Sequence, residues 1–577
     1  MTTVRDATFD VLRRHGLSTI FCNPGSTEVS LLTGLPDDLR FVLALHEGSV
    51  VGMATGWAIG RYEGSGAPEP IRGGPALVVL HTTAGLGNAV GAVATARVNR
   101  VPLVILVGQQ DRRHLALEPF LAGRLDGLAG DYPVWVDQPV RAQDVPGAVA
   151  RACHEAVTFR GPALVVVPMD DWDAAFEGEI TAAAQQVVRP LAVADADLAP
   201  LVSLLAGARA PAIVAGAGAD WESLVGLAER LGCPVFQESF GARAGFPQDH
   251  PQYAGVLPAD RVRLRAVLAG HDVVLAVGAP VFRQYPYVPG PLVAAGTAVA
   301  VITDDPAEVH RSPADLAYLA APSAVCARLT ALLPPGGQDS GGGGGVEGRP
   351  ADGGGGVEGR PADGGGGVEG RPAGGGGSVG TRPAAVPPVP EGGRPLRAAH
   401  VLRELAVRLS ADTVLLEETP SSRPDLHRLV PARNPLGFLS AAMGGLGFAL
   451  PAAVGLRMAL PDRPVVAVVG DGSALYGMHA LWSAAHYRVG ALFVVLANGR
   501  YAVMDRLADQ RGGKAPWPPF TEVDMGALAR SLGCPARRVE TYEELTAALD
   551  EVVPGLSARE EPLLLDVTVT VDPDFQP

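Results

Sequence analysis

Short apolar runs alternate with longer amphipathic segments along most of the chain. Near the start, Val4–His15 and Gly48–Tyr62 have the periodicity of helices, and Phe41–Leu45 between them has the run of apolar residues expected of a buried strand. Thr3 and Gly16 stand where a helix cap and a helix end are expected. Such alternation is typical of parallel strands covered by helices, so it predicts an α/β fold.

The alternation falls into three blocks, which predict three doubly wound parallel-sheet domains. They span residues 1–180, 190–335 and 396–577. Residues 336–395 differ, because the unit GGGGVEGRPAD recurs back to back between Gly342 and Ala373. Glycine maximises the conformational entropy of the chain, and few apolar groups are present whose burial would offset the entropy lost on ordering. We therefore expect a flexible Gly-rich linker whose extra copies are dispensable for folding.

Composition and charge exclude several classes of protein. The formal net charge of −15 argues against a nucleic-acid-binding surface. The five cysteines are odd in number and form no CxxC pair, which argues against a disulfide framework or a zinc site. The first residues have no apolar signal core, and the uncharged stretch Gly437–Leu456 is interrupted by glycines and Pro451. A soluble cytoplasmic protein is expected.

The third block carries a candidate metal and diphosphate site. The apolar strand Val465–Val469 runs directly into Gly470-Asp471-Gly472-Ser473, and Asn498 follows the next apolar strand, Leu492–Leu496. Neighbouring parallel strands end at the same edge of a sheet, so Asp471 and Asn498 are expected to converge. Their oxygens suit Mg²⁺, while the glycines and a following helix N-terminus suit a phosphate.

Each glycine motif also has an ordinary structural interpretation. A bare GDG is often a simple turn, and it is the Asn at the next strand end that favours a cofactor. Gly216-Ala217-Gly218 follows another apolar strand, but no third glycine completes a dinucleotide motif, so a tight turn is predicted there.

The spacing of GDG and Asn resembles the motif of thiamine-diphosphate-dependent enzymes. Across nearly the whole chain, further segments resemble the benzoylformate decarboxylases of that family in order and approximate spacing. Only the glycine repeats and a short insertion near residues 64–74 stand outside the resemblance. The segments are Asn23-Pro-Gly-Ser26, Leu45-His-Glu47, His81-Thr-Thr-Ala-Gly-Leu-Gly-Asn88, Val107-Gly-Gln-Gln110, Asp170-Asp-Trp172, Gly278-Ala-Pro-Val-Phe-Arg283, Gly444-Gly-Leu-Gly-Phe-Ala-Leu-Pro451 and Gly470-Asp-Gly-Ser473.

The resemblance implies pyrimidine-binding, central and diphosphate-binding domains in that order. It implies a homodimer or homotetramer with each active site between subunits, thiamine diphosphate and Mg²⁺ as cofactors, and no nucleic-acid or membrane partner. Asp471, Asn498 and the backbone carbonyl of Arg500 match the metal ligands. Glu47 matches the acid that hydrogen-bonds the cofactor's pyrimidine ring. The residues expected to bind the cofactor are Glu47, Ser421, Leu446, Gly470, Asp471, Gly472, Ser473 and Asn498.

The implied reaction is decarboxylation of a 2-oxo acid to an aldehyde. Ser26 matches a serine that contacts the substrate carboxylate, and His81 matches a histidine that helps to protonate the intermediate. Considered alone, Ser26 fits a turn-capping serine equally well, and His81 fits a hydrogen-bonded histidine at a strand end. Glu47 alone is readable as a first-turn glutamate that favours the helix dipole.

The pattern of the family is broken at a few positions. Tyr285 stands where a second histidine is usual, and tyrosine donates a hydrogen bond but shuttles protons poorly near pH 7. In the substrate pocket, Ser440 and Leu507 replace phenylalanines and Val503 replaces an alanine. The substrate is therefore expected to be benzoylformate-like, with branched aliphatic or differently substituted aryl 2-oxo acids as alternatives.

Two other functions remain open. An acetolactate-synthase-like carboligase would share Glu47 and the metal motif but would join two oxo acids. A non-catalytic paralogue that serves as an assembly subunit would share the fold, although it would have no need of Glu47, Asp471 and Asn498.

Overall fold

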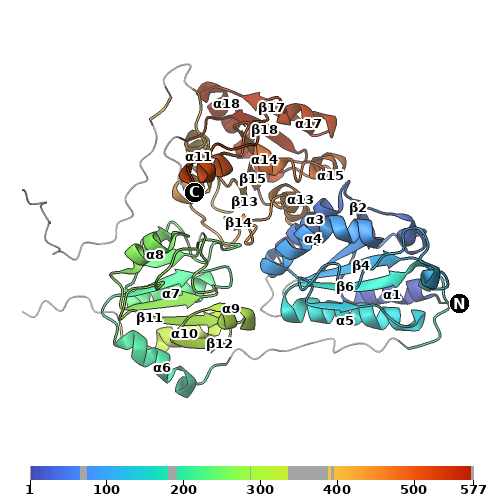
Figure 1. Cartoon of the computed structure of the whole chain (residues 1–577), viewed down its shortest axis with the longest axis horizontal. Helices are drawn as coiled ribbons and strands as arrows, with labels where there is room; N and C mark the ends of the chain where they lie inside the picture. The colour runs from blue at the N-terminus through green and yellow to red at the C-terminus, as the bar shows by residue number, and fades with distance from the viewer. Residues whose placement is uncertain are drawn as a thin grey trace, which may run out of the picture.

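A computed structural model describes most of the chain, and within it three six-stranded sheets form, each with all its strand pairs parallel (Figure 1). This confirms the predicted α/β class and its three sheets. The predicted linker, residues 336–395, lies almost wholly outside the described part. The described residues are 2–64, 74–179, 192–285, 287–335, 388–390 and 395–572.

The first sheet has the strand order β2-β1-β3-β4-β6-β5. Thr3 caps its first helix by accepting a hydrogen bond from the Asp6 backbone N–H, as the sequence predicts. Its strands are β1 (Thr19–Cys22), β2 (Arg40–Leu43), β3 (Ala76–His81), β4 (Leu103–Gln109), β5 (Trp135–Asp137) and β6 (Pro162–Pro168). Its helices are α1 (Val4–Arg14), α2 (Val29–Leu32), α3 (Glu47–Gly64), α4 (Thr82–Val98) and α5 (Val145–Phe159), with short 3₁₀ turns η1 (Ser26–Glu28), η2 (Leu115–Leu117), η3 (Ala142–Asp144) and η4 (Met169–Asp171).

The second sheet has the order β12-β11-β10-β7-β8-β9. The Ala219 N–H donates to the Gly216 carbonyl at 3.0 Å, so this loop is the tight turn predicted from the sequence. The strands are β7 (Pro211–Ala215), β8 (Val235–Gln237), β9 (Tyr253–Val256), β10 (Val273–Val277), β11 (Ala298–Thr303) and β12 (Leu316–Leu319). The helices are α6 (Asp195–Ala206), α7 (Trp221–Leu231), α8 (Arg261–Leu268), α9 (Pro306–Arg311) and α10 (Pro322–Leu332).

The third sheet has the order β14-β13-β15-β16-β18-β17. The long uncharged stretch near residue 440 is divided between a two-residue strand, a turn and α13. The strands are β13 (Val414–Glu418), β14 (Leu439–Ser440), β15 (Val465–Gly470), β16 (Leu492–Ala497), β17 (Ala536–Val539) and β18 (Leu563–Thr568). The helices are α11 (Ala398–Ala406), α12 (Arg423–Leu429), α13 (Ala449–Ala459), α14 (Asp471–Ala474), α15 (Ala480–His486), α16 (Ala502–Gln510), α17 (Met525–Ser531), α18 (Tyr542–Val552) and η5 (Val553–Ala558).

The described residues test the predictions about the cysteines, a membrane-spanning helix and one strand boundary. All five cysteines are buried and free, as predicted. In the part of the chain that is described, no helix has both the length and the apolar character needed to cross a membrane. The strand predicted at Phe41–Leu45 is shifted: β2 ends at Leu43, and Leu45 is 40% exposed because the chain has left the sheet to begin α3.

Helices α3 and α13 join the first and third domains into one core (Figure 1). Two glycines allow these helices to pack closely. A Cβ added at Gly56 would overlap the Ala452 carbonyl, and a Cβ added at Gly455 would overlap the Met53 carbonyl. The two backbones therefore touch directly. This contact fixes the placement of the strand ends of both domains relative to each other.

We predict that Gly455→Ala destabilises the protein by about 1–3 kcal/mol, the range for forcing extra atoms into a packed core. Gly91→Ala is the matched control, because Gly91 also lies within a helix but a Cβ there would meet open space. The control should be unchanged or slightly more stable. Thermal unfolding midpoints measure both, and a wild-type midpoint for Gly455→Ala would show that the backbones are not in contact.

Candidate active site

The carboxyl edge of the first sheet gathers Ser26, Glu47 and His81. Strand β1 lies between β2 and β3 in the sheet, and each residue follows or ends one of these strands. Ser26 begins η1, Glu47 begins α3, and His81 ends β3. Parallel strands bring their carboxyl ends to one edge, so three residues distant in sequence become neighbours.

Glu47 is held by two neutral amides at this edge. Glu47 is 9% exposed, and its carboxyl oxygens accept hydrogen bonds from Asn23 Nδ2 at 3.3 Å and from Asn88 Nδ2 at 3.1 Å. It also stands in the first turn of α3, where the helix dipole favours a carboxylate. The side chain is thus fixed in direction by partners on two other segments of the domain.

His81 is oriented by a buried threonine and glutamate. Its Nδ1 lies 2.9 Å from Thr27 Oγ1 and 3.3 Å from Glu28 Oε2. Glu28 is 2% exposed, and it also accepts hydrogen bonds from the Thr27 hydroxyl and from the Gly25 N–H, the latter at 2.8 Å. Burial raises the pKa of the Glu28 carboxyl. The Nδ1 side of the imidazole is therefore held by the protein.

Close packing around this cluster depends on two glycines. A Cβ at Gly25 would overlap the His81 ring, and a Cβ at Gly108 would overlap the side chains of Thr27 and Glu28. Ser26, in contrast, is exposed at the same edge. Glu28 was not predicted from the sequence, because a single acidic residue in a three-residue turn gives no periodic signal of burial.

In the third domain, Asp471 and Asn498 converge as predicted. Strands β15 and β16 pair in parallel, and the two residues directly follow them. Asp471 Oδ2 accepts hydrogen bonds from the backbone N–H groups of Asn498 at 2.8 Å and Gly499 at 2.6 Å, while Oδ1 accepts from Gly472 at 2.8 Å. The carboxyl is 4% exposed, and burial raises its pKa.

The oxygens at this edge fit a magnesium ion and a diphosphate. Asp471 supplies a buried carboxylate, whose charge a nearby cation would stabilise, and Asn498 supplies a neutral amide oxygen, Oδ1, which accepts the Arg500 N–H at 3.0 Å. Gly472 lies close against Tyr501, because a Cβ there would come within 2.8 Å of the Tyr501 ring. The helix predicted to follow is only the four-residue α14, which contains Gly472 and Ser473.

Two further predicted cofactor contacts lie near this edge. Ser421 is half-buried in the turn that follows β13, the strand beside β15. Leu446 lies in the turn between β14 and α13 and is 38% exposed, although it is apolar. The hydrogen bonds described above tie Glu47 to the first domain and Asp471 to the third.

The positions that depart from the family pattern have distinct surroundings. Tyr285 is 62% exposed. Ser440 is 3% exposed, and its hydroxyl donates to Glu417 Oε2 at 2.9 Å. Val503 and Leu507 are half-buried on α16. The polarity introduced by Ser440 is therefore satisfied inside the protein by Glu417.

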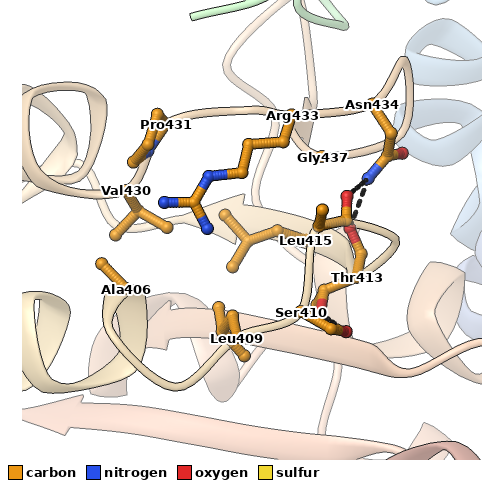
Figure 2. A pocket seen from close by; sticks show the side chains of 11 residues that line it. Ala406, Leu409, Ser410, Thr413, Leu415, Val430, Pro431, Arg433, Asn434 and Gly437 are labelled. Carbon is orange, nitrogen blue, oxygen red and sulfur yellow. Dashed lines mark hydrogen bonds between the residues drawn. The ribbon is translucent and has the colours of Figure 1, made fainter. Parts of the chain in front are cut away.

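Figure 2 shows a small cavity at the opposite end of β13. It is lined by residues that include Leu409, Leu415 and Arg433, and Asn434 Nδ2 donates to the Thr413 carbonyl at 3.0 Å beside it. Its volume of about 20 Å³ suffices for a single water molecule. None of the predicted site residues lines it, so the candidate site is the open edge where the strands end.

Comparison with protein families gives three matches in chain order. Residues 2–129 match the N-terminal TPP binding domain of thiamine pyrophosphate enzymes, residues 198–329 match the central domain, and residues 421–567 match the C-terminal TPP binding domain.

Individual relatives match over nearly the full length. A benzoylformate decarboxylase of Pseudomonas aeruginosa is 37% identical, covering 99% of this chain and 100% of the relative. A putative acetolactate synthase large subunit of Mycobacterium tuberculosis is 28% identical over 98% of each chain. Among solved structures, a thiamine-diphosphate-dependent 4-hydroxybenzoylformate decarboxylase of Rhodococcus jostii has a TM-score of 0.84 and 32% identity over 99% of each chain. A benzoylformate decarboxylase from Polynucleobacter necessarius has a TM-score of 0.86 and 28% identity over 100% of each chain.

We predict that Glu28→Gln lowers kcat by about 10-fold or more, on the expectation that His81 transfers a proton, because its imidazole would lose one of the groups that orient it. Steady-state kinetics of the variant and the wild type measures the loss in kcat. Glu308→Gln is the matched control, because Glu308 is also buried and paired with a threonine, Thr303, but lies in the central domain. Equal effects of the two substitutions would contradict a specific role for Glu28.

Proposed function

This chain belongs to the thiamine-diphosphate-dependent 2-oxo acid decarboxylases, and we propose that it converts a benzoylformate-like 2-oxo acid to the aldehyde and carbon dioxide with Mg²⁺ as a further cofactor. Decarboxylation by such an enzyme fits both halves of the site. The observation that carries the proposal is that the carboxyl edges of the first and third sheets each present a set of polar groups held by buried partners.

The residues of the third domain would hold the cofactor. Asp471, Asn498 and the Arg500 carbonyl are the proposed ligands of Mg²⁺. The hydroxyl groups of Ser421 and Ser473 and the backbone of Gly472 are proposed to contact the diphosphate. Leu446 would lie against the thiazolium side of the cofactor. When bound, thiamine diphosphate supplies an electron sink that accepts the electrons released as carbon dioxide leaves.

The residues of the first domain would act on the cofactor and the substrate. Glu47 would hydrogen-bond the pyrimidine ring, with Asn23 and Asn88 fixing its direction. The exposed Ser26 hydroxyl would orient the substrate carboxylate, and His81, anchored through Nδ1, would help to deliver a proton to the carbon from which carbon dioxide has left. Tyr285 is proposed to donate a hydrogen bond and not to shuttle protons.

Subunit pairing would bring the two halves together. We propose a homodimer or homotetramer in which Glu47 of one chain faces Asp471 of another. Large apolar side chains left exposed near the two edges support this, notably Phe120 at 88% and Leu446 at 38%. The five free, buried thiols suit a reducing compartment, so we place the enzyme in the cytoplasm.

A screen of 2-oxo acids tests the proposed function. Benzoylformate, 4-hydroxybenzoylformate and a branched aliphatic 2-oxo acid are each incubated with enzyme, thiamine diphosphate and Mg²⁺, and carbon dioxide, aldehyde and hydroxyketone are measured. We expect aldehyde and carbon dioxide from the aryl acids, lost when chelation removes Mg²⁺. Hydroxyketone as the main product would favour carboligation. Absence of calorimetric binding of thiamine diphosphate would favour the assembly subunit.

In the same assay Glu47→Gln should lower kcat by about 100-fold or more, because the amide cannot replace the carboxyl at the pyrimidine ring. Affinity for Mg²⁺ and the diphosphate should be retained, since those groups contact the third domain. Glu560→Gln, at a side chain that is 74% exposed, is the control and should keep full activity. Full activity of Glu47→Gln would refute the role of Glu47.

A further inference from the structure

The turn that carries Leu446 is supported from below by a buried carboxylate, that of Glu418. Gly444 and Gly447 in this turn have φ angles of +72° and +91°, a conformation that favours glycine. Between and beside them, Leu446 and Met443 are 38% and 42% exposed. The turn therefore presents apolar side chains to the outside, and its shape needs support from elsewhere.

Glu418 provides that support through three hydrogen bonds. It ends β13 and is 6% exposed. Its Oε1 accepts from the Gly447 N–H at 2.6 Å, and its Oε2 accepts from Phe448 at 2.8 Å and Ala449 at 2.7 Å. These N–H groups lie at the start of α13, where a helix has no internal acceptors for them. The N-cap residue, Phe448, has no side-chain acceptor to offer, so Glu418 takes its place.

The preceding residue, Glu417, holds the other end of the same segment. Its carboxylate accepts from the Ser440 hydroxyl, 2.9 Å away, and from the backbone N–H of Thr419. Asn99 of the first domain also bonds the Ser440 carbonyl and the Ala442 N–H, each at 3.0 Å. The chain before and after the turn is thus fixed, and Leu446 lies between the fixed ends.

The register of the third sheet links this support to the metal site. Glu418 pairs with Val469 on β15, and Asp471 follows two positions later. A carboxylate on one strand end therefore sets the position of the Leu446 turn relative to the neighbouring strand end. Burying a charge beside Glu417 is costly, and burial raises the pKa of Glu418 to about 7. An apolar residue at position 418 would avoid this cost but would leave three N–H groups unpaired.

From these contacts we infer that Glu418 is a positioning residue, which holds Leu446 at a fixed separation from Asp471 so that both contact one cofactor molecule. The inference rests on the proposed function, because it assigns Leu446 and Asp471 to the same cofactor. Glu418 itself touches neither substrate nor cofactor in this role. Its effect passes entirely through the turn at residues 444–447.

A double-mutant cycle tests the inference. Glu418→Gln should weaken calorimetric binding of thiamine diphosphate about 10-fold and lower kcat with little change in KM, because one amide oxygen cannot accept all three N–H groups. Leu446→Ala should have a similar effect, and the double variant should be no worse than about 2-fold beyond the stronger single variant, since both changes act at one place. Additive losses, or wild-type affinity and kcat in Glu418→Gln, would overturn the inference.

Glu404→Gln is the matched control. Glu404 is 8% exposed in the same domain and accepts hydrogen bonds from Arg408 and Tyr542, and its helix, α11, packs against α12 and α18. It should keep wild-type affinity and kcat, and equal defects in both variants would reduce Glu418 to a general stabilising role and overturn the inference.

If Glu418→Gln does not fold, Glu418→Asp replaces it, because the shorter carboxylate keeps its charge but reaches fewer of the N–H groups. Full cofactor affinity in that variant would also overturn the inference. If the wild-type protein releases no carbon dioxide, the proposed function fails, whereas the affinity for thiamine diphosphate still tests Glu418.

Discussion

The hydrogen bonds from backbone N–H groups to the Asp471 carboxylate hold the ends of β15 and β16 together, and the candidate site depends on that junction. A buried carboxylate needs partners, and here the N–H groups of Gly472, Asn498 and Gly499 provide them. The same bonds place Asn498 beside Asp471. One interaction thus stabilises the fold locally and assembles oxygens suited to a divalent cation.

Buried carboxylates play a similar part at other strand ends. Glu28 anchors His81 at the edge of the first sheet, and Glu418 supports the Leu446 turn at the edge of the third. Each of these carboxylates is placed by a strand or turn and accepts hydrogen bonds from neighbouring donors, so the group that it contacts is held in position. The direct contact of α3 with α13 through Gly56 and Gly455 then fixes one domain against the other. Rigid strand ends and touching helices together determine where the functional groups lie.

Much of the fold follows from local pattern, whereas the support of the site does not. Val465–Val469 is a continuous apolar run and becomes a fully buried strand, and parallel order then brings Asp471 to Asn498. Glu28 and Glu418 were not identified, because the donors that justify their burial lie in other segments. The need for glycine at position 455 could not be predicted from nearby residues either, because it comes from the Met53 carbonyl in another domain. Which Glu47 serves which Asp471 depends on a second chain.

Subunit complementation tests the central claim most directly. The variants Glu47→Gln and Asp471→Ala, each inactive alone, are mixed, dissociated and allowed to reassociate, and decarboxylation is measured. If Glu47 of one chain serves Asp471 of its partner, each mixed dimer contains one intact site, and activity should return to roughly a quarter of wild type. If both residues act within one chain, every site keeps a defect, and the mixture would remain inactive, contradicting the account.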